Sequence, residues 1–475
     1  MIRFILNEKE ISTDLPVGEL LLDFIRYHEH LIGTKIGCRE GDCGACTTLI
    51  GEIKNGELQY HSVTSCLVAL GSVQGKHVVT IEGTNMDQLN PLQHAMSEEG
   101  ATQCGFCTPG FIVSFAGFCL SKKEPCYDNA VASINGNICR CTGYKSIERA
   151  AAGVTKLMEG RRGGDAIKFV TMQNILPAYF GSVKQKLNKL LSDTNGSLTE
   201  KNADKFLGGG TDLYVQEPEA MSTADIHFLP GNEDLKGIFK QGNKCVIDAA
   251  STATDLAESS IFQNYFPGLS GYIKLIASTP IRNIATIGGN LVNASPIGDF
   301  TIFFLALDAR LVLNDHGQKR ELPLRKFYKA YKIIDKKRGE FIEKISFELP
   351  GENTLFNFEK VSKRTHLDIA GVNSAISIKT VGQTITSASV SAGGVAPVPC
   401  YLSKTSAFLK GKILSEQIID KTIAIAQSEI SPISDARGSE EYKRLLLGQL
   451  IKAHFITLFP FLNVKMILEM KEPAN

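Results

Sequence analysis

The chain has almost no net charge and no long hydrophobic run. Its 475 residues contain 51 Lys and Arg against 50 Asp and Glu, so no excess of positive charge attracts nucleic acid or an anionic membrane surface. No apolar stretch approaches the roughly 18 residues that cross a bilayer, and residues 301–307 are far too few. We therefore expect protein and small-molecule partners, with no nucleic acid and no membrane.

The sequence also lacks a secretory leader, an internal repeat and a low-complexity tract. Arg3, Glu8, Lys9 and Glu10 interrupt the apolar start that a signal peptide needs, so we expect a cytoplasmic protein. In that compartment twelve cysteines are better explained by metal binding than by disulfides. The nine His are scattered and no Ser-His-Asp arrangement is present, so we assign no catalytic residue.

Four cysteines in the first part of the chain have the spacing of metal ligands. They are Cys38, Cys43, Cys46 and Cys66. A Cys-x4-Cys-x2-Cys run followed by a distant fourth Cys is typical of a plant-type [2Fe–2S] cluster. Gly41, Gly44 and Ala45 allow the tight turns that such a loop needs. A zinc site is the weaker interpretation because zinc motifs usually pair Cys-x2-Cys with a second pair, and disulfides are weaker still.

The residues around this loop predict a small mixed sheet crossed by one helix. Alternating and β-branched residues favour short strands, and Asn55-Gly56 is a strong hairpin signal. We expect strands at residues 1–6, around 11, and at 47–53, 58–61 and 78–81, with a helix over 20–31. This order fits a β-grasp, ferredoxin-like domain over residues 1–84.

A helical region over residues 85–158 carries four more spaced cysteines. They are Cys104, Cys107, Cys139 and Cys141. A Cys-x2-Cys alone could be redox-active or zinc-binding, but joined to a Cys-x-Cys thirty residues on it favours a second four-thiolate site. We expect helices over 89–96, 111–120, 129–134 and 147–158. The remaining cysteines are expected to be small buried residues, namely Cys119, Cys126, Cys245 and Cys400.

The segments around the second set of cysteines resemble the two-cluster domain of the molybdenum hydroxylases, the xanthine dehydrogenase and aldehyde oxidase family. They read QCGFCTPGF over residues 103–111 and NGNICRCTGY over 135–144. The resemblance covers residues 1 to about 158 and implies a four-helix bundle around the second cluster. It also implies that the Cys104 cluster is nearest the molybdopterin and the Cys38 cluster lies on the flavin side.

A charged, glycine-rich segment over residues 159–166 is expected to be a linker. The domain predicted after it, over residues 167–351, contains two glycine stretches. Their members are Phe206, Leu207, Gly208, Gly209, Gly210, Thr211, Asp212 and Leu213, then Thr286, Ile287, Gly288, Gly289 and Asn290. Consecutive glycine N–H groups can surround a pyrophosphate. Neither stretch matches Gly-x-Gly-x-x-Gly, and each alone would more often be a turn.

Together these two stretches resemble the flavin domain of the same family, which has the vanillyl-alcohol oxidase (PCMH-type) fold. Residues 280–285 and 294–299 extend the likeness. The resemblance implies that both stretches bind FAD, together with Asp299 and Lys360. Ile276 is a departure, because animal xanthine dehydrogenases place Phe there, and an aliphatic side chain lacks aromatic stacking on the flavin.

The last predicted domain, residues 352–475, shows strand patterns at 375–380 and 385–392 and helical patterns at 418–426 and 442–455. Its SDARGS segment at 434–439 resembles the C-terminal domain of the family's flavoproteins. We interpret it as a packed α+β domain without chemistry of its own.

The whole sequence is therefore expected to be a multidomain α+β protein. The resemblance implies an electron-transfer subunit with two 2Fe-2S clusters and FAD, a molybdopterin-binding large subunit as partner, and NAD as acceptor. It further implies a heterotetramer of two small and two large subunits. The fusion of clusters and FAD in one chain favours purine oxidation. A hydroxylase of aldehydes or other N-heterocycles, and a free-standing iron–sulfur flavoprotein reductase, remain open.

Overall fold

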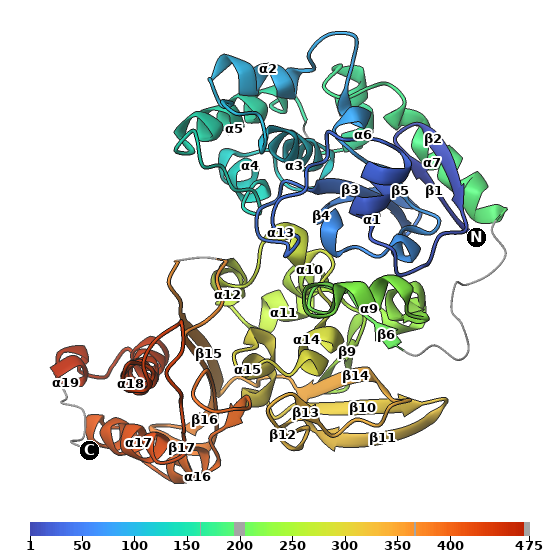
Figure 1. The fold of residues 1–475 in the computed structure, drawn as a ribbon. Coiled ribbons are helices and arrows are strands. Elements are labelled where there is room, and N and C mark those ends of the chain that lie inside the picture. Colours follow the sequence, from blue (N-terminus) through green and yellow to red (C-terminus); the bar gives the residue numbers. More distant parts are fainter. Residues whose placement is uncertain (162, 194–204, 365–366, 470–475) are drawn as a thin grey trace. The chain divides into compact units, whose positions relative to one another are not determined.

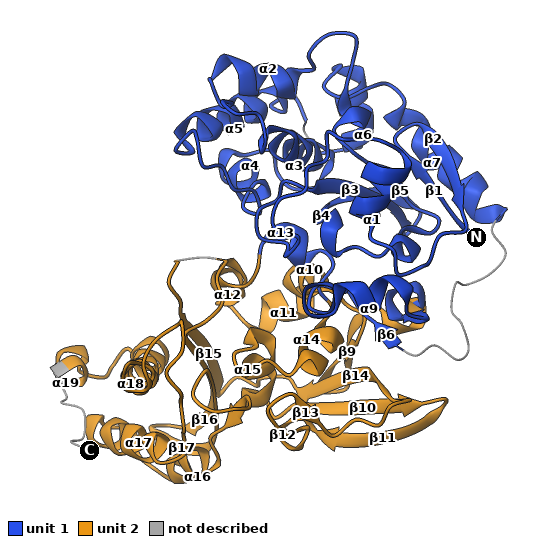
Figure 2. Ribbon diagram, viewed as in Figure 1, with its two compact units in different colours: residues 1–232, 278–285 blue, residues 233–277, 286–475 orange. Residues whose placement is uncertain are grey.

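The computed structural model describes residues 1–161, 163–193, 205–364 and 367–469, which fall into two compact units (Figure 2). Unit 1 comprises Met1–Asn232 and Ser278–Ala285, and unit 2 comprises Glu233–Ala277 and Thr286–Asn475. Arg162 of the predicted linker and residues 470–475 of the predicted last domain lie outside the described residues. The domain boundaries given above stay predictions.

Unit 1 begins with a five-stranded mixed sheet in the order β2-β1-β5-β3-β4, which confirms the β-grasp arrangement (Figure 1). Its strands are β1 (Ile2–Leu6), β2 (Lys9–Thr13), β3 (Thr47–Lys54), β4 (Glu57–Thr64) and β5 (His77–Val79). β1 and β5 run parallel, and the other pairs run antiparallel. Asn55 and Gly56 both have positive φ, 53° and 75°, which suits the tight hairpin turn between β3 and β4.

The helix across this sheet is shorter than the sequence pattern predicts. It consists of α1 (Leu21–Asp23) and a π-helical turn over Phe24–His28, where residues 20–31 were expected. His30 then adopts a left-handed conformation with φ 55°, which ends the helix two residues after the π turn.

The four helices predicted around the second cysteine set are present and share one apolar core. They are α2 (Pro91–Glu98), α3 (Thr108–Leu120), α4 (Tyr127–Ser133) and α5 (Lys145–Leu157). Asn90 and Gln93 form a capping box, and Pro91 occupies the first helical position, so α2 starts at residue 91 rather than at 89. α3 packs against β3 and β4, which joins the bundle to the sheet.

Two further helices complete this core, α6 (Ala166–Met172) and α7 (Phe180–Ser192). Val170, Phe180 and Leu187 are buried in the same core as α3, and α7 contacts β1. The rest of unit 1 consists of short elements that support a glycine loop. They are the parallel strands β6 (Lys205–Leu207) and β7 (Ile226–Phe228), and the helices α8 (Leu213–Gln216), α9 (Pro218–Thr223) and α13 (Thr279–Arg282).

Unit 2 contains a second five-stranded sheet, antiparallel throughout, in the order β11-β10-β14-β9-β8. Its strands are β8 (Ile238–Gln241), β9 (Lys244–Asp248), β10 (Arg310–Asp315), β11 (Gln318–Pro323) and β14 (Phe341–Glu348). The helices of this part are α10 (Ala253–Glu258), α11 (Ser260–Tyr265), α12 (Leu269–Leu275), α14 (Ile287–Asn293) and α15 (Asp299–Ala306). A small pair, β12 (Tyr328–Ala330) and β13 (Ile333–Ile334), lies outside this sheet.

The C-terminal part of unit 2 is a four-stranded antiparallel sheet with helices on both faces (Figure 1). Its strands are β15 (Thr354–Val361), β16 (Val372–Val381), β17 (Thr384–Gly393) and β18 (Cys400–Tyr401), and its helices are α16 (Ser403–Leu409), α17 (Glu416–Gln427), α18 (Glu440–Leu458) and α19 (Val464–Glu469). Successive strand residues point to opposite faces, so Ala375 joins the core beside α15 whereas Ile376 joins the core beside α18.

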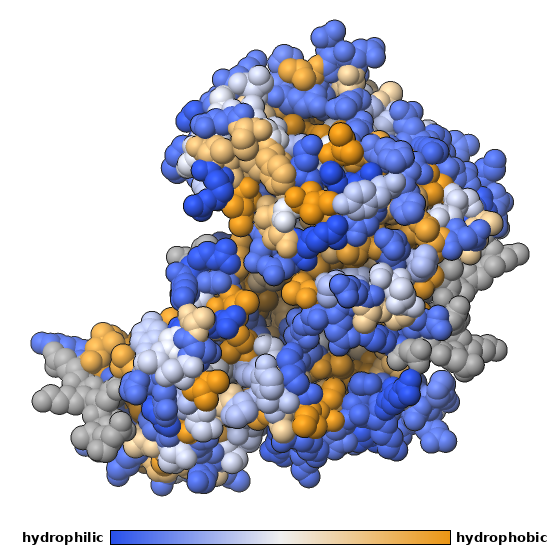
Figure 3. Space-filling model, in the orientation of Figure 1, coloured by the Kyte–Doolittle hydropathy of each residue, from blue (hydrophilic) through white to orange (hydrophobic). Residues whose placement is uncertain are grey.

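Polar residues interrupt the apolar groups on the face drawn in Figure 3. Among the described residues, no helix is both long enough and apolar enough to cross a membrane.

Among the residues that the structure describes, two histidines are buried, one in each unit. His77 is bonded at Nδ1 to the Tyr60 hydroxyl at 2.8 Å and at Nε2 to the Asn7 carbonyl oxygen at 2.8 Å. Burial lowers the pKa of His77 to about 4 and that of His454 to about 3, from the usual 6.5. As the pH falls, these two histidines therefore take up protons at a higher pH in the unfolded chain than in the folded protein.

We predict that stability is complete above about pH 6.5 and is lost as the pH falls toward 4, by about 2 kcal/mol per histidine at pH 5. Urea unfolding followed by far-UV circular dichroism at pH 7.5 and 5.0 measures this. Before urea is added, the folded protein should show the same cluster absorbance at both pH values. His77→Gln should weaken the pH dependence, whereas the exposed His316→Gln should not. Equal pH dependence in wild type and His77→Gln would contradict the assignment.

Candidate functional site

The first cysteine loop, residues 38–46, turns through left-handed backbone conformations. Gly41 and Gly44 have φ of 80° and 67°, and Arg39 has φ of 57°. A Cβ at Gly37 would lie 2.6 Å from Cys43 Sγ, so a side chain there would occupy the space beside the sulfur. The small residues of this loop are therefore required both by conformation and by room around the thiols.

The four thiols of the first set occur as two pairs. Cys38 pairs with Cys43, and Cys46 pairs with Cys66. The hydrogen bond from Cys43 lowers the pKa of Cys38 to about 4, and the bond from Cys66 lowers the pKa of Cys46. The pKa of each partner is raised, first by the same hydrogen bond and then by burial. In each pair the hydrogen bond between the two sulfurs thus lowers the pKa of one thiol and raises that of the other.

Backbone N–H groups also point at these sulfurs. Glu40 N donates to Cys38 Sγ at 3.3 Å, and Cys38 N donates to Cys43 Sγ at 3.4 Å. Among the described residues, no group of three or more His, Cys, Asp or Glu side chains is arranged around one metal ion. Two separate thiol pairs fit a [2Fe–2S] cluster, because each of its two irons takes two thiolates. The residues present therefore fit the predicted cluster.

The second set shows the same pairing at the edge of the bundle. Cys104 and Cys141 are exposed, with their sulfurs 3.6 Å apart. Cys107 and Cys139 form the other pair; burial, with help from Cys139, raises the pKa of Cys107 to about 12. Burial alone would raise the pKa of Cys139, but hydrogen bonds led by that of Thr142, whose Oγ1 lies 3.2 Å from the sulfur, lower it overall.

The prediction that the other four cysteines are small buried residues is confirmed for two of them. Cys119 and Cys245 are buried, and Cys126 and Cys400 are partly buried.

The two cysteine sets are joined by backbone contacts. Ile138 N, one residue before Cys139, donates to Cys43 O at 3.0 Å. Asn137 Nδ2 donates to Gly44 O at 3.0 Å. A cysteine of the first set is thus one hydrogen bond away from the residue next to a cysteine of the second.

The segment Ser278–Ala285 lies with the cysteine sets in unit 1, an arrangement that sequence reasoning missed. Thr279 N donates to Asn135 Oδ1 at 2.9 Å, and Asn283 Nδ2 donates to Ser62 O at 2.8 Å. Ile281 lies beside the first loop, since a Cβ at Gly41 would come within 2.6 Å of its Cδ1. Only the likeness of residues 280–285 to a flavin motif marked this segment, and nothing in the sequence indicated its contacts.

The first glycine stretch lies in unit 1 and begins in β6. Phe206 packs on His227 of β7, with ring centroids 5.4 Å apart. After Leu207 the loop runs through Gly208, Gly209, Gly210, Thr211 and Asp212 into α8, which starts at Leu213. Gly210 has φ of 79°, and a Cβ at Gly209 would lie 1.8 Å from Ile284 O. Glycine at 209 therefore lets α13's segment contact the loop backbone directly.

The second glycine stretch lies in unit 2, where it forms the start of α14. Thr286 caps the helix, and its Oγ1 accepts from Gly289 N at 3.2 Å. Gly288 N donates to Ala249 O at 2.9 Å, and Asn290 N donates to Thr286 O at 3.0 Å. These three N–H groups are thus already bonded within the protein. Ile287, which directly precedes these three residues, is fully buried.

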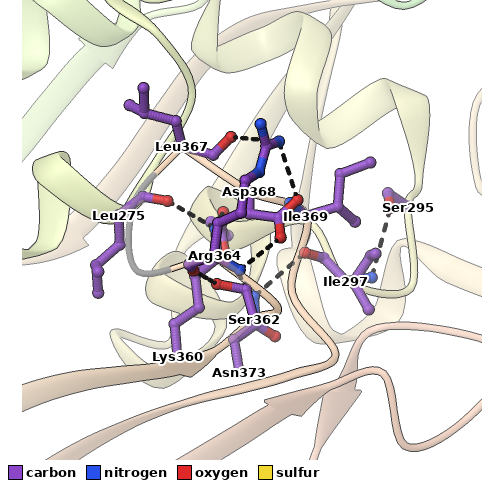
Figure 4. A network of polar contacts seen from close by, with 11 residues as sticks. Leu275, Ser295, Ile297, Lys360, Ser362, Arg364, Leu367, Asp368, Ile369 and Asn373 are labelled. Atoms are coloured by element: carbon purple, nitrogen blue, oxygen red, sulfur yellow. Dashed lines mark hydrogen bonds and ion pairs between the residues drawn. The ribbon is translucent and has the colours of Figure 1, made fainter. Parts of the chain in front are cut away.

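Asp299 and Lys360 form a largely buried ion pair in unit 2. Figure 4 shows Lys360, Leu275 and Asn373 in the polar network of which this pair is part. Lys360 Nζ lies 2.7 Å from Asp299 Oδ2 and 2.8 Å from Leu275 O, and its side chain is 1 % exposed. Asn373 Nδ2 donates to the other carboxylate oxygen at 2.6 Å. Burial raises the pKa of Asp299, opposed by Lys360 and Asn373. The ammonium and amide therefore hold the carboxylate in place.

This network contains an unused polar atom suited to a ligand. Asn373 Oδ1 is buried and has no hydrogen-bond partner among the described residues. Buried polar groups are normally satisfied, so such an atom indicates a missing partner. A nearby turn is fixed by Asp368, whose Oδ2 accepts from Arg364 N at 3.0 Å. Ile276 is 6 % exposed and packs in the apolar core of this unit.

Comparison with known proteins gives the same set of domains. Residues 4–70 match a 2Fe-2S iron-sulfur cluster binding domain, and residues 80–152 match a [2Fe-2S] binding domain. Residues 186–350 match the FAD binding domain in molybdopterin dehydrogenase, and residues 358–458 match the CO dehydrogenase flavoprotein C-terminal domain.

Two curated relatives are similar over most of this chain. It is 28 % identical to a xanthine dehydrogenase of Emericella nidulans over 86 % of its length, and 29 % identical to xanthine dehydrogenase 1 of Arabidopsis thaliana over 97 %. The chain spans 35 % and 40 % of the length of these relatives.

A solved carbon monoxide dehydrogenase from Hydrogenophaga pseudoflava is similar with a TM-score of 0.50 and 26 % identity. The likeness covers 56 % of this chain and 90 % of that one. Two [2Fe–2S] domains, the FAD-binding domain and the C-terminal flavoprotein domain in one sequence make up the cluster and flavin domain set of the molybdenum hydroxylases.

Proposed function

We propose that this chain is the iron–sulfur and FAD electron-transfer subunit of a xanthine dehydrogenase. In this proposal a separate large subunit carries the molybdopterin and oxidises hypoxanthine and xanthine to urate, with NAD as the final acceptor. Two small and two large subunits form a cytoplasmic heterotetramer. The names of the relatives support the substrate and the dehydrogenase activity.

The contact between the two cysteine sets carries the electron-transfer role. Ile138 N and Cys43 O, 3.0 Å apart, connect a ligand residue of one set to the neighbour of a ligand in the other. The bound clusters supply one-electron chemistry, and FAD exchanges both single electrons and electron pairs. The protein's part is to hold the thiols in pairs, to fix the distance between the sets and to keep both loops rigid.

The exposed pair of the second set supports a protein partner. Cys104 and Cys141 lie at the surface, and Phe106 and Tyr144 beside them are 47 % and 40 % exposed. Exposed aromatic side chains of this kind are enriched at protein interfaces. We propose that the molybdopterin subunit covers this surface, which brings its cofactor to the second cluster.

In unit 2 we propose that Lys360, Asp299 and Asn373 contact FAD. The buried ammonium and carboxylate are already oriented by one another, and Asn373 Oδ1 is free to bond the flavin. Both glycine stretches, Phe206 to Leu213 and Thr286 to Asn290, remain proposed FAD contacts. Three N–H groups of the second stretch are already bonded within the protein. We therefore expect this stretch to contribute to FAD binding by letting the cofactor lie close against its backbone.

The proposed function is tested by the anaerobic visible spectrum of the tagged protein, isolated from its own source with its co-purifying subunits. Xanthine should bleach the flavin and iron–sulfur absorbance, and NAD should restore it. Bleaching by NADH but not by xanthine would contradict the substrate and direct the search to aldehydes and other N-heterocycles. A stable monomer reduced by NADH, with no molybdenum partner, would support a free-standing reductase instead.

The ligand assignment predicts the outcome of a matched pair of cysteine substitutions. Cys43→Ser should abolish or grossly change the EPR signal of one reduced cluster and leave the other cluster and FAD bound. Cys119→Ser, which removes a fully buried thiol in α3, should leave both signals in place. Two unchanged signals in Cys43→Ser, or a lost signal in Cys119→Ser, would show that the wrong thiols were assigned.

The flavin assignment predicts different effects for two neighbouring lysines. Lys360→Met leaves Asp299 buried without its cation, so bound FAD per chain should fall severalfold while both cluster signals persist. Lys363, which is exposed and bonds Ala436 O, provides the control, and Lys363→Met should retain FAD. Equal FAD content in the two purified variants would be evidence against the Lys360 role.

A further inference from the structure

The turn Asn135–Asn137 lies between the end of α4 and Cys139 and contacts three separate parts of unit 1. Asn137 is 6 % exposed, and both ends of its amide are bonded. Ser114 Oγ of α3 donates to Asn137 Oδ1 at 2.7 Å. Asn137 Nδ2 donates to Gly44 O at 3.0 Å and to Thr47 Oγ1 at 3.2 Å. One side chain thus ties the bundle to the first cysteine loop.

Close backbone packing surrounds this amide. A Cβ at Gly44 would lie 2.3 Å from Gly136 O, and a Cβ at Gly110 would lie 2.4 Å from Gly44 O. No side chain separates the cysteine loop, the turn and α3 at these points. The hydrogen bonds of Asn137 therefore act where the backbones are already in contact, and loss of the amide allows the loops to move apart.

The other end of the turn contacts α13. Asn135 Oδ1 accepts from Thr279 N at 2.9 Å, and Pro280 Cδ lies 2.8 Å from where a Cβ at Gly136 would be. α13 in turn lies against β4 (Figure 1). The two asparagines of one turn therefore bond in different directions, Asn137 to the first cysteine loop and Asn135 to α13.

We propose that Asn137 is a positioning residue that fixes the distance between the two cysteine sets, and so sets the coupling of the clusters they hold. Asn137 itself contacts no ligand sulfur among the bonds described above. It acts by holding Gly44 O, which keeps Cys43 O within reach of Ile138 N. This inference rests on the proposed electron-transfer function. It adds that a neutral side chain outside the ligand set governs transfer between the clusters.

The test is EPR spectroscopy of the purified complex after full reduction with dithionite. When two paramagnetic clusters lie close, their spins split each other's signals, and the splitting falls steeply with distance. Asn137→Ala should keep the iron content and both signals but reduce or remove the splitting. Reduction of the first cluster by electrons from the second should slow by about tenfold or more, because small displacements at preorganised sites cost large factors in rate.

Matched variants separate positioning from general damage. Asn129→Ala removes a half-buried asparagine of α4, bonded to Glu124 O at 3.0 Å, and should leave the splitting unchanged. Asn135→Ala should also keep the splitting, because its bond leads to α13. If Asn137→Ala does not fold, Ser114→Ala provides the milder variant, since it removes the bond that orients the Asn137 amide.

Splitting of wild-type size in Asn137→Ala, or in Ser114→Ala when the former does not fold, would overturn the inference. Equal loss of splitting in Asn129→Ala would also overturn it, because the effect would then be one of bundle stability. A wild-type complex without two distinct cluster signals would instead contradict the proposed function itself. The failure of the inference and the failure of the proposed function are thus distinguishable in one set of spectra.

Discussion

The pairing of four thiols, three of them in the short loop 38–46, is the constraint on which unit 1 depends. Residues 38–46 can return on themselves only because Arg39, Gly41 and Gly44 adopt left-handed conformations. For Arg39 that conformation costs on the order of 1 kcal/mol, and its two hydrogen bonds to Asp23, at 2.6 and 3.0 Å, hold it in place. The loop is therefore shaped by the chain itself, which presents sulfurs in pairs before any iron is considered.

The same loop leaves its backbone open to neighbours. Its glycines allow Gly136 O and α3 to contact it without intervening side chains, and Ile281 packs against Gly41. The cysteine loop, the helical bundle and α13 are thereby kept in direct contact. The candidate cofactor residues of unit 2 are of a different kind. They are the ion-paired Lys360, bonded to Leu275 O, and Asp299, bonded to Asn373. The candidate site of unit 1 thus depends on the geometry of its thiols, and that of unit 2 on an ion pair that is largely shielded from water.

Much of this could be predicted from the sequence where a local rule applies. The Asn55-Gly56 turn, the four helices of the bundle and the strands at 375–380 and 385–392 follow from turn chemistry and periodicity, and the structure confirms them. The cluster and FAD domains followed from motif spacing and resemblance, and the comparisons confirm them. The individual ligand and FAD-contact residues stay predictions.

Long-range contacts were beyond sequence reasoning. Thr279 meets Asn135 across more than a hundred residues, and no spacing rule relates the two. Helices α6 and α7 were not expected at all, although Val170 and Leu187 join the core of the bundle. The short helix α1 was overestimated, because the left-handed His30 that ends it gives no signal in hydrophobic periodicity.

The position of α13 has a consequence for how the protein can be divided. Ser278–Ala285 belongs to unit 1, although the residues on both sides of it in the sequence belong to unit 2. Neither unit is therefore one continuous stretch of chain, and no single cut separates them whole. A fragment ending at residue 232 loses Ile281, which packs against the first loop. A fragment starting at residue 233 contains Ser278–Ala285 without the rest of unit 1, to which this segment belongs. The two units therefore alternate along the sequence, and neither can be replaced by exchanging one continuous segment of chain.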